Sequence, residues 1–173
     1  TFNGNVNIEN TDLTIRGTDL DPMSVGRGGG AVSTNTRVGV QALAANTSGS
    51  QNTAFGYQAL LTNNVGASNT AIGNRALRVA GIASNNIAIG KDVMLVTLSG
   101  SKNVAIGNNA MESNQTGSAN VCIGHYAGYD ILGDGNVLIG PADNETSADA
   151  TFRPPNISCL LYTSPSPRDV CSS

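Results

Sequence analysis

NTAFGYQAL, residues 52–60, is one of seven related segments in this chain of 173 residues. The copies begin at Asn35, Asn52, Asn69, Asn86, Asn103, Asn120 and Asn136. Successive copies lie 17 residues apart, except the last, which follows after 16. A fixed period sustained over this length is typical of solenoids and other repeat arrays. The repeat therefore predicts a stack of similar coils over residues 35–140.

Each copy predicts one short strand. Its second and fourth positions are mostly β-branched, as in Val104 and Ile106, and a small residue such as Ala71 or Ala105 lies between them. Residues two apart on a strand share a face, so the branched residues form one face and the small residues the other. The fourth position holds Phe55, Ile72, Ile89, Ile106 and Ile123. Because both faces are apolar, we expect both to be buried.

Two further positions recur around the strand. A glycine ends it in every copy, which predicts a positive φ or a close approach that a Cβ would block. These glycines are Gly39, Gly56, Gly73, Gly90, Gly107, Gly124 and Gly140. Four residues later, Leu43, Leu60, Leu77, Met94 and Met111 predict a second apolar contact in each coil. The asparagines that begin the copies are predicted to stack as a ladder, with amides bonding coil to coil.

The remaining sequence differs from the array. In residues 1–34, alternation over 2–8 and 12–16 predicts two short strands, as one hairpin or the end of a preceding β segment. Glycines within 26–30 predict a flexible or tightly turning connector, and the stretch lacks the Gly-Lys-Ser/Thr ending of a phosphate-binding loop. Residues 141–158 are polar and predict a linker. The fold class expected is all-β, a parallel β-solenoid of about seven coils.

Residues 159–173 are expected to contribute nothing to the fold. Their first eleven residues, CLLYTSPSPRD, resemble the translation of a transposase adapter used to build sequencing libraries. That resemblance implies a reading frame truncated where the cloned insert ended, so the chain is expected to be a fragment. Cys122 is then the one native cysteine, and no disulfide framework is predicted.

Composition disfavours several function classes. The net charge is −3 and only 12% of residues are charged, so no basic stripe points to nucleic acid as a partner. No apolar run approaches the ~20 residues of a membrane span. Aromatic residues make up only 4% of the chain, which suits a stack of thin coils better than a compact globular core.

The repeat over 35–140 resembles the head repeats of trimeric autotransporter adhesins, whose strand motif is close to N-S-V-A-I-G. It is closer to the NTAIGYQAL-type arrays of phage tail fibres, and TDLTIRGTDLDPMSVG, residues 11–26, also looks like tail-fibre sequence. The resemblance implies a left-handed parallel β-roll, with three chains packed around one axis. It further implies that residues such as Val104 and Ile106 fill each roll, while those such as Ala105 pack at the trimer axis. The coil of 17 residues is longer than the adhesin-head coil.

No catalytic, cofactor-binding or metal site is predicted. The one histidine, His125, occupies a position that accepts varied residues and is expected to lie at the surface, while Cys122 replaces alanine and is expected to be buried. A Cys122–His125 dyad lacks a third group to orient it. Asp130 and Asp134 flank the last turn, where one ion is a weaker alternative. Tyr57, Tyr126 and Tyr129 are the candidates for glycan stacking, with ordinary surface roles preferred.

The function expected is therefore that of a non-enzymatic structural or adhesive fibre segment, from a phage tail fibre or a trimeric surface adhesin. It would extend and present a region that binds a host or cell-surface receptor, and it would be located in a virion tail fibre or at the cell surface. Two alternatives remain. An ice- or carbohydrate-binding solenoid would need a regular outward threonine array for ice, but the branched face is expected to be the core. The shaft of a polysaccharide-degrading tailspike would need paired acidic residues.

Overall fold

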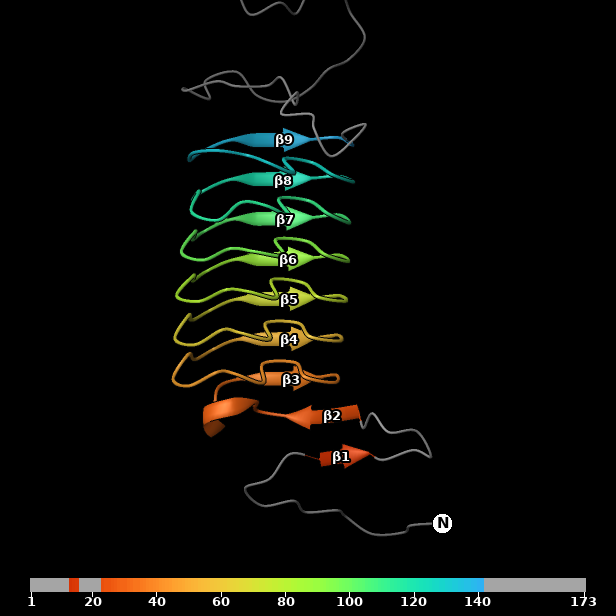
Figure 1. Ribbon diagram of the computed structural model, residues 1–173, viewed down its shortest axis with the longest axis vertical. Coiled ribbons are helices and arrows are strands. Elements are labelled where there is room, and N and C mark those ends of the chain that lie inside the picture. Colours follow the sequence, from red (N-terminus) through yellow and green to blue (C-terminus); the bar gives the residue numbers. More distant parts are fainter. Residues whose placement is uncertain (1–12, 16–22, 142–173) are drawn as a thin grey trace, which may run out of the picture.

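The computed structural model describes residues 13–15 and 23–141, which form one nine-stranded sheet in the order of the chain. The first two strands are β1 (Leu13–Ile15) and β2 (Met23–Gly26), followed by a short 3-10 helix, η1 (Gly29–Ala31). The other strands are β3 (Thr36–Val38), β4 (Thr53–Phe55), β5 (Thr70–Ile72), β6 (Ile87–Ile89), β7 (Val104–Ile106), β8 (Val121–Ile123) and β9 (Val137–Ile139). Figure 1 shows them stacked as rungs along one axis.

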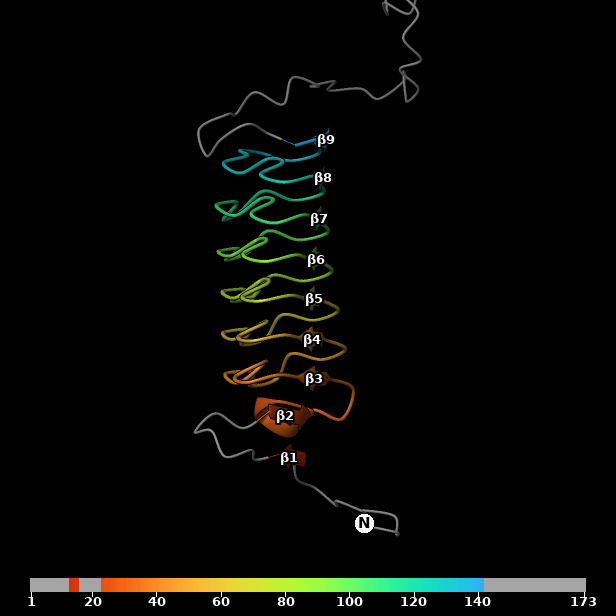
Figure 2. The same cartoon turned by 90° about the vertical axis from the view of Figure 1, so that its right-hand side faces the viewer.

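The predicted solenoid is confirmed. Strands β3 to β9 are parallel, and equivalent repeat positions lie side by side, so that Ala71 pairs with Ala88 and Ala88 with Ala105. Each coil has two walls, which Figure 2 shows edge-on: the strand on one side and the returning segment on the other. The expected second contact is confirmed, since Leu60, Leu77 and Met94 are fully buried.

The prediction that the branched face fills the core is wrong. The small residues between the branched ones point inward, and Ala71, Ala88 and Ala105 are 0% exposed. Ile72 and Ile106 are 38% and 36% exposed on the outer face. The reason is the thinness of the coil, because a buried leucine or methionine from the opposite wall leaves room for little more than a methyl group. Ala105, which the resemblance places at a trimer axis, therefore lies inside the coil, and Val104 and Ile106, which it places inside the roll, lie on the outer face.

Coil six shows the same constraint on volume. Cys122 replaces the inward alanine, and Gly128 replaces the leucine or methionine of other coils, so a larger residue on one wall faces a smaller one on the other. A Cβ on Gly128 would lie 2.6 Å from the Cys122 sulfur. Ile131 packs against the core beside this pair. The interior is thus filled by complementary pairs rather than by one residue type.

The glycine and asparagine predictions are both confirmed. Gly73 has φ of 136°, and a Cβ there would lie 2.2 Å from the carbonyl oxygen of Gly90 in the next coil. The Asn69 side-chain oxygen accepts a hydrogen bond from the backbone N–H of Asn86 at 3.0 Å, while its amide donates to the Ala83 carbonyl at 2.8 Å. Equivalent bonds join the starting asparagines from Asn35 to Asn136. Each buried amide therefore links two coils and closes its own.

The structure also holds many non-glycine residues at positive φ, which the sequence did not predict. They recur at three positions of the coil. They are Gln41, Gln58, Arg75, Asp92, Asn109 and Tyr126 at the first; Leu43, Leu60, Leu77, Met94 and Met111 at the second; and Gln51, Ser68, Asn85, Lys102 and Ala119 at the third. Such conformations cost about 1–3 kcal/mol each outside glycine. They persist because hydrogen bonds to the coils above and below hold the backbone of every coil in place.

The N-terminal segment closes one end of the stack. Strand β2 pairs antiparallel with both β1 and β3, so it covers the edge of the first parallel strand. The expected strand within residues 12–16 is confirmed, but its hairpin partner is β2, and residues 2–8 lie outside the described part. The Gly29 N–H donates to the Leu43 carbonyl at 2.9 Å, and a Cβ on Gly30 would lie 2.3 Å from the Thr47 oxygen. Of the two alternatives predicted for the glycine run, the tight turn is confirmed, and the turn packs against the first coil as a cap.

A second asparagine ladder is interrupted in the middle of the stack. Asn63 donates to the side-chain oxygen of Asn46 at 3.1 Å and to the Gly66 carbonyl at 2.8 Å. In the next coil Ala80 stands where asparagine would continue the ladder, and the Asn63 side-chain oxygen is buried without a hydrogen-bond partner. A Cβ on Gly66 would lie 2.4 Å from that oxygen, so an asparagine at this position needs a glycine three residues later. Where alanine replaces the asparagine, at residue 80, the residue three further on is also alanine, Ala83.

This gap predicts strong coupling between Ala80→Asn and Ala83→Gly. Ala80→Asn alone should destabilise the protein, because the Ala83 methyl group crowds the new amide. With Ala83→Gly the amide can donate to Asn63, and we expect a coupling free energy of about 1–3 kcal/mol in favour of the pair. Urea unfolding of the wild type, both single variants and the double variant measures it. Additive effects would show that the two positions do not share one space.

Candidate functional surface

The outward face of strands β3 to β9 is uncharged and mostly apolar, and its side chains form two columns; it is here called the outer sheet face. The amino-end column holds Thr36, Thr53, Thr70, Ile87, Val104, Val121 and Val137, and the carboxyl-end column holds Val38, Phe55, Ile72, Ile89, Ile106, Ile123 and Ile139. Phe55 is 55% exposed and Ile139 65%. Since the parallel register aligns equivalent positions, the columns run straight along the stack. A surface of this kind is suited to contact with another apolar surface.

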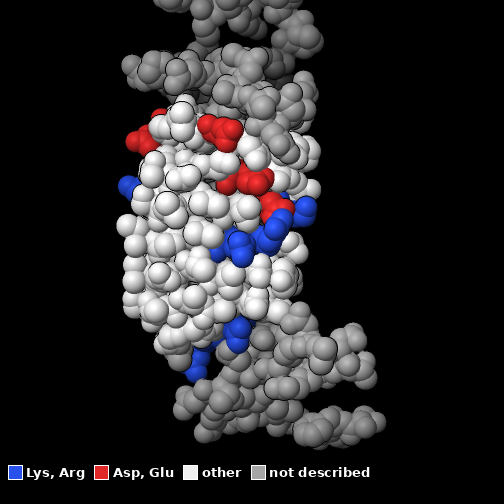
Figure 3. Space-filling model, in the orientation of Figure 1, with Lys and Arg blue, Asp and Glu red and all other residues white. Residues whose placement is uncertain are grey.

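Charged residues avoid this face. Strands β4 to β9 contain no Asp, Glu, Lys or Arg, and the one charged strand residue in β3 to β9, Arg37, is at an inward position. Burial lowers the pKa of Arg37. The visible face of Figure 3 instead carries a band of charged side chains, with acidic groups nearer the β9 end and basic groups nearer the β2 end. The molecule therefore has charged and uncharged sides.

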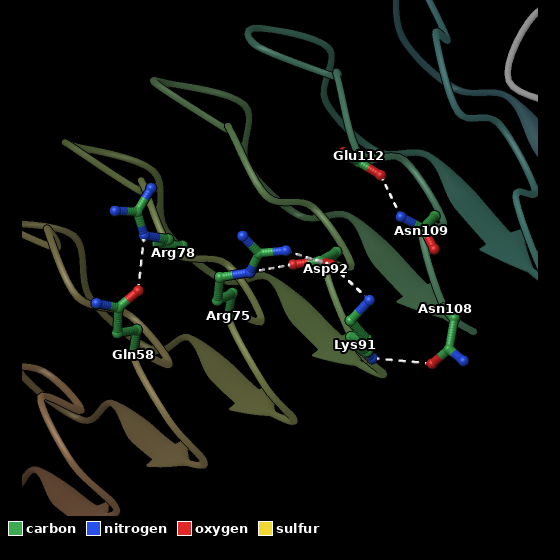
Figure 4. A network of polar contacts seen from close by, with 8 residues as sticks. All are labelled: Gln58, Arg75, Arg78, Lys91, Asp92, Asn108, Asn109 and Glu112. Atoms are coloured by element: carbon green, nitrogen blue, oxygen red, sulfur yellow. Dashed lines mark hydrogen bonds and ion pairs between the residues drawn. The ribbon is translucent and has the colours of Figure 1, made fainter. Parts of the chain in front are cut away.

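The charged side chains of neighbouring coils form the network of Figure 4, on the corner that follows the turn glycines. Arg75 contacts Asp92 through two atom pairs, Nε to Oδ1 at 2.6 Å and Nη2 to Oδ2 at 2.7 Å. The hydrogen bond to Asp92 raises the pKa of Arg75, with its negative charge adding to the effect. Lys91 lies 3.3 Å from the same carboxylate, and Arg78 donates to Gln58 at 3.1 Å. These contacts tie neighbouring coils together.

Cys122 is buried and His125 is exposed, as predicted for a core residue and a surface residue. Cys122 lies in the core at 0% exposure, and burial raises the pKa of its thiol to about 12, which keeps it neutral at physiological pH. His125 is exposed, and its ring lies edge-on against Tyr126 at a centroid distance of 4.3 Å. The thiol thus points inward while the imidazole is at the surface, so the structure does not bring the two groups together.

The remaining candidate residues lie at the surface. Asp134 accepts a hydrogen bond from the Ser118 N–H at 2.6 Å, and Asp130 is exposed. Within 13–15 and 23–141, no three His, Cys, Asp or Glu side chains gather as they would around a metal ion. Tyr126 and Tyr129 form a half-buried pair with centroids 5.7 Å apart, and Tyr57 is 43% exposed four coils away. The three tyrosines therefore do not form one glycan platform.

The branched face of the strands is accessible to a partner such as ice in the single chain. The branched face was expected to be core and hence inaccessible, whereas Thr36 and Thr53 are exposed on it. The face does not carry the regular threonine array that ice binding needs, because isoleucine or valine replaces threonine from Ile87 onward. The outer sheet face is thus accessible in the single chain, but most of it is aliphatic.

Comparison of the chain with protein-family models, with curated proteins and with solved structures gave no match. In the part of the chain that the structure describes, no helix has the length and apolar character needed to cross a membrane.

Proposed function

We propose that this chain is a segment of a non-enzymatic fibre in which three copies associate through their outer sheet faces. The observation that carries the proposal is the pair of outward columns along β3 to β9, which hold no charged side chain and are aliphatic or aromatic except at Thr36, Thr53 and Thr70. If other copies of the chain cover this surface, its removal from water stabilises the assembly by roughly 25 cal/mol per Å² of apolar area buried. A threefold arrangement also agrees with the resemblance of residues 35–140 to trimeric fibre proteins.

The role proposed for the fibre is to extend and present a receptor-binding region. A stack whose coils are joined by backbone bonds, asparagine ladders and ion pairs is a stiff spacer, and its long axis gives reach. Of the two contexts, we favour a phage tail fibre over a trimeric surface adhesin, because residues 11–26 resemble tail-fibre sequence. The proposed location is accordingly a virion tail or a cell surface, with a host or cell-surface receptor as partner.

The test is the solution mass of the chain, measured by light scattering, in the wild type and in Ile106→Glu. The wild type should have the mass of three chains. Ile106 is outward and 36% exposed in the single chain, so Glu there should leave the coil folded but place three carboxylates at the shared axis. Burying unpaired charges costs several kcal/mol, and we expect the mass to fall to that of one chain.

The matched control is Asn108→Glu, which adds the same charge at an exposed position on the corner after the turn glycine. It should retain the mass of three chains and the β-rich circular dichroism spectrum. A wild-type chain that is folded and has the mass of one copy would rule out the trimer. It would also favour the ice- or carbohydrate-binding alternative, since the outer sheet face would then be open to other partners.

A further inference from the structure

The strands alone provide too small a surface for a stable trimer. Three residues per strand and a strand spacing of ~4.8 Å give a face roughly 10 Å wide and 30 Å high, or about 300 Å². Specific interfaces typically bury about 800 Å² on each partner, and each chain of a trimer meets two neighbours. The contact must therefore extend beyond the strands onto at least one edge of the sheet.

The corner that leads into the strands carries a second apolar surface. Val65, Ile82 and Leu98 lie in three successive coils and are 49%, 63% and 45% exposed, and we call them the corner ridge. Val65 and Ile82 occupy the same position of the repeat, and Leu98 lies one residue before it in the next coil. Backbone bonds join the three coils here: the Ile82 N–H donates to the Leu98 carbonyl at 3.1 Å, and the Val65 N–H donates to the Gly81 carbonyl at 3.3 Å. In Figure 1 these loops form the left margin of the stack, at the amino ends of the strands.

The opposite corner is different in chemistry. Its exposed position after each turn glycine is mostly polar and holds Val40, Tyr57, Asn74, Lys91, Asn108 and His125. The apolar surface of the described residues is therefore asymmetric: outside the strands, their large exposed aliphatic side chains lie on the amino-end corner, where Ser68, Asn85 and Lys102 separate the ridge from the strands. An asymmetric surface suits a ring of three, in which one patch of each chain meets a different patch of the next.

Threefold symmetry also fixes which residues meet. Chains related by a threefold axis have equal coils at equal heights, so the corner ridge of one chain faces the same coils of its neighbour. At those heights the carboxyl-end column of the outer sheet face is apolar in every coil, whereas the amino-end column holds Thr53 and Thr70 before Ile87. Phe55 shares a coil with Val65, Ile72 with Ile82, and Ile89 with Leu98.

We propose that the corner ridge of each chain packs against Phe55, Ile72 and Ile89 of the next chain, closing the trimer as a ring. This inference rests on the proposed fibre function and specifies the interface that it uses. The contact joins 63%-exposed Ile82 to 38%-exposed Ile72, so both sides lose their accessible apolar surface. It also predicts that the ridge of one chain does not touch the ridge of another.

Disulfide trapping in the full chain tests this arrangement, with Cys159 and Cys171 replaced by serine to remove their thiols. Ile72→Cys combined with Ile82→Cys should, after mild oxidation, give a band of three linked chains on a non-reducing gel. Neither single variant should give linked chains. A further control combines Ile72→Cys with Gln115→Cys. Gln115 is exposed on the same corner as Ile82 but two coils further along the stack, so it should lie too far from Ile72 of the next chain to form a disulfide.

The outcomes separate this inference from the proposed function. A wild-type mass of three chains with no linkage in the Ile72/Ile82 pair would overturn the ridge contact and leave the fibre proposal standing. Linkage in Ile82→Cys alone would also overturn it, because ridge would then meet ridge. A wild-type mass of one chain would overturn both proposals. A double variant whose thiols are consumed within single chains would count against the ridge contact as well.

Discussion

Gly73→Ala is expected to abolish the stable fold. Gly73 has φ of 136°, a conformation that side chains rarely adopt, and an added Cβ would lie 2.2 Å from the Gly90 oxygen and 2.7 Å from its carbonyl carbon. Both atoms belong to the backbone of the next coil, so neither can rotate away. Backbone strain costs about 1–3 kcal/mol, and the clash adds to it by pushing two coils apart. Since natural domains are stable by about 5–15 kcal/mol, the sum removes much of the total.

Gly140→Ala is the matched control for this substitution. Gly140 has nearly the same φ, 131°, but nothing within 4 Å of the place where its Cβ would lie. The two variants therefore share the backbone strain and differ in the clash with the next coil. Thermal unfolding followed by circular dichroism should show a much larger loss for Gly73→Ala. Equal losses would mean that the glycine is needed for its φ alone and that the coils can separate to admit a methyl group.

Much of this fold follows from the period of the sequence. The number of coils, the strand in each copy and the closing glycine can be read from residues such as Asn69 and Gly73, because a repeat that stacks must place equivalent residues side by side. The predicted ladder and the buried position of Leu77 are confirmed for the same reason. Because the coils stack in register, a position predicted correctly for one copy is also correct for the equivalent residues of most other copies.

The assignment of the branched face to the core, which the resemblance implies, is wrong because the size of a side chain does not decide its burial in so thin a coil. The sequence contained a better signal in the alternation of the strand. Asn69 and Ala71 are two residues apart and share a face, so a buried asparagine ladder requires the alanine to point inward with it. Ile72 must then point outward. The spacing between Ala71 and Leu77 carries the same information, since the two side chains fill one narrow interior from opposite walls.

The positive φ angles of Leu60 and Gln58 could not be predicted from the sequence. Neither residue favours that conformation, and glycine is absent from both positions in this coil. The backbone of each is held instead by bonds to adjacent coils: Leu60 donates to Ala76 at 3.1 Å and Gln58 to Val40 at 2.9 Å. The conformation is a property of the stack rather than of the local sequence. The exposure of the outer sheet face is likewise a property of the folded coil, because it depends on Ala71 and Leu77 filling the interior together.

Asn86→Ala is expected to be the most damaging substitution of a polar side chain. The Asn86 amide donates to the Gly100 carbonyl and to the Asn69 side chain at 3.0 and 3.1 Å. Its oxygen accepts from the backbone and the side chain of Asn103 at 3.0 and 3.2 Å. Alanine removes all four bonds, and the Gly100 carbonyl and the Asn103 N–H lose their bonding partner. The Asn69 oxygen keeps its bond from the Asn86 N–H, and the Asn103 amide keeps its bond to the Gly117 carbonyl. At about 1–3 kcal/mol for each buried group left without a partner, we expect a loss of about 3–5 kcal/mol.

Asn108→Ala provides the comparison, because Asn108 is exposed and its side chain accepts one hydrogen bond, from the Lys91 N–H at 2.9 Å. Water can replace that bond, so its loss should cost less than about 1 kcal/mol. Urea unfolding of both variants measures the difference. Similar stabilities would show that water enters the coil and satisfies the broken ladder. A large difference would mean that the ladder holds the coils together from inside, which leaves the outer sheet face available for association.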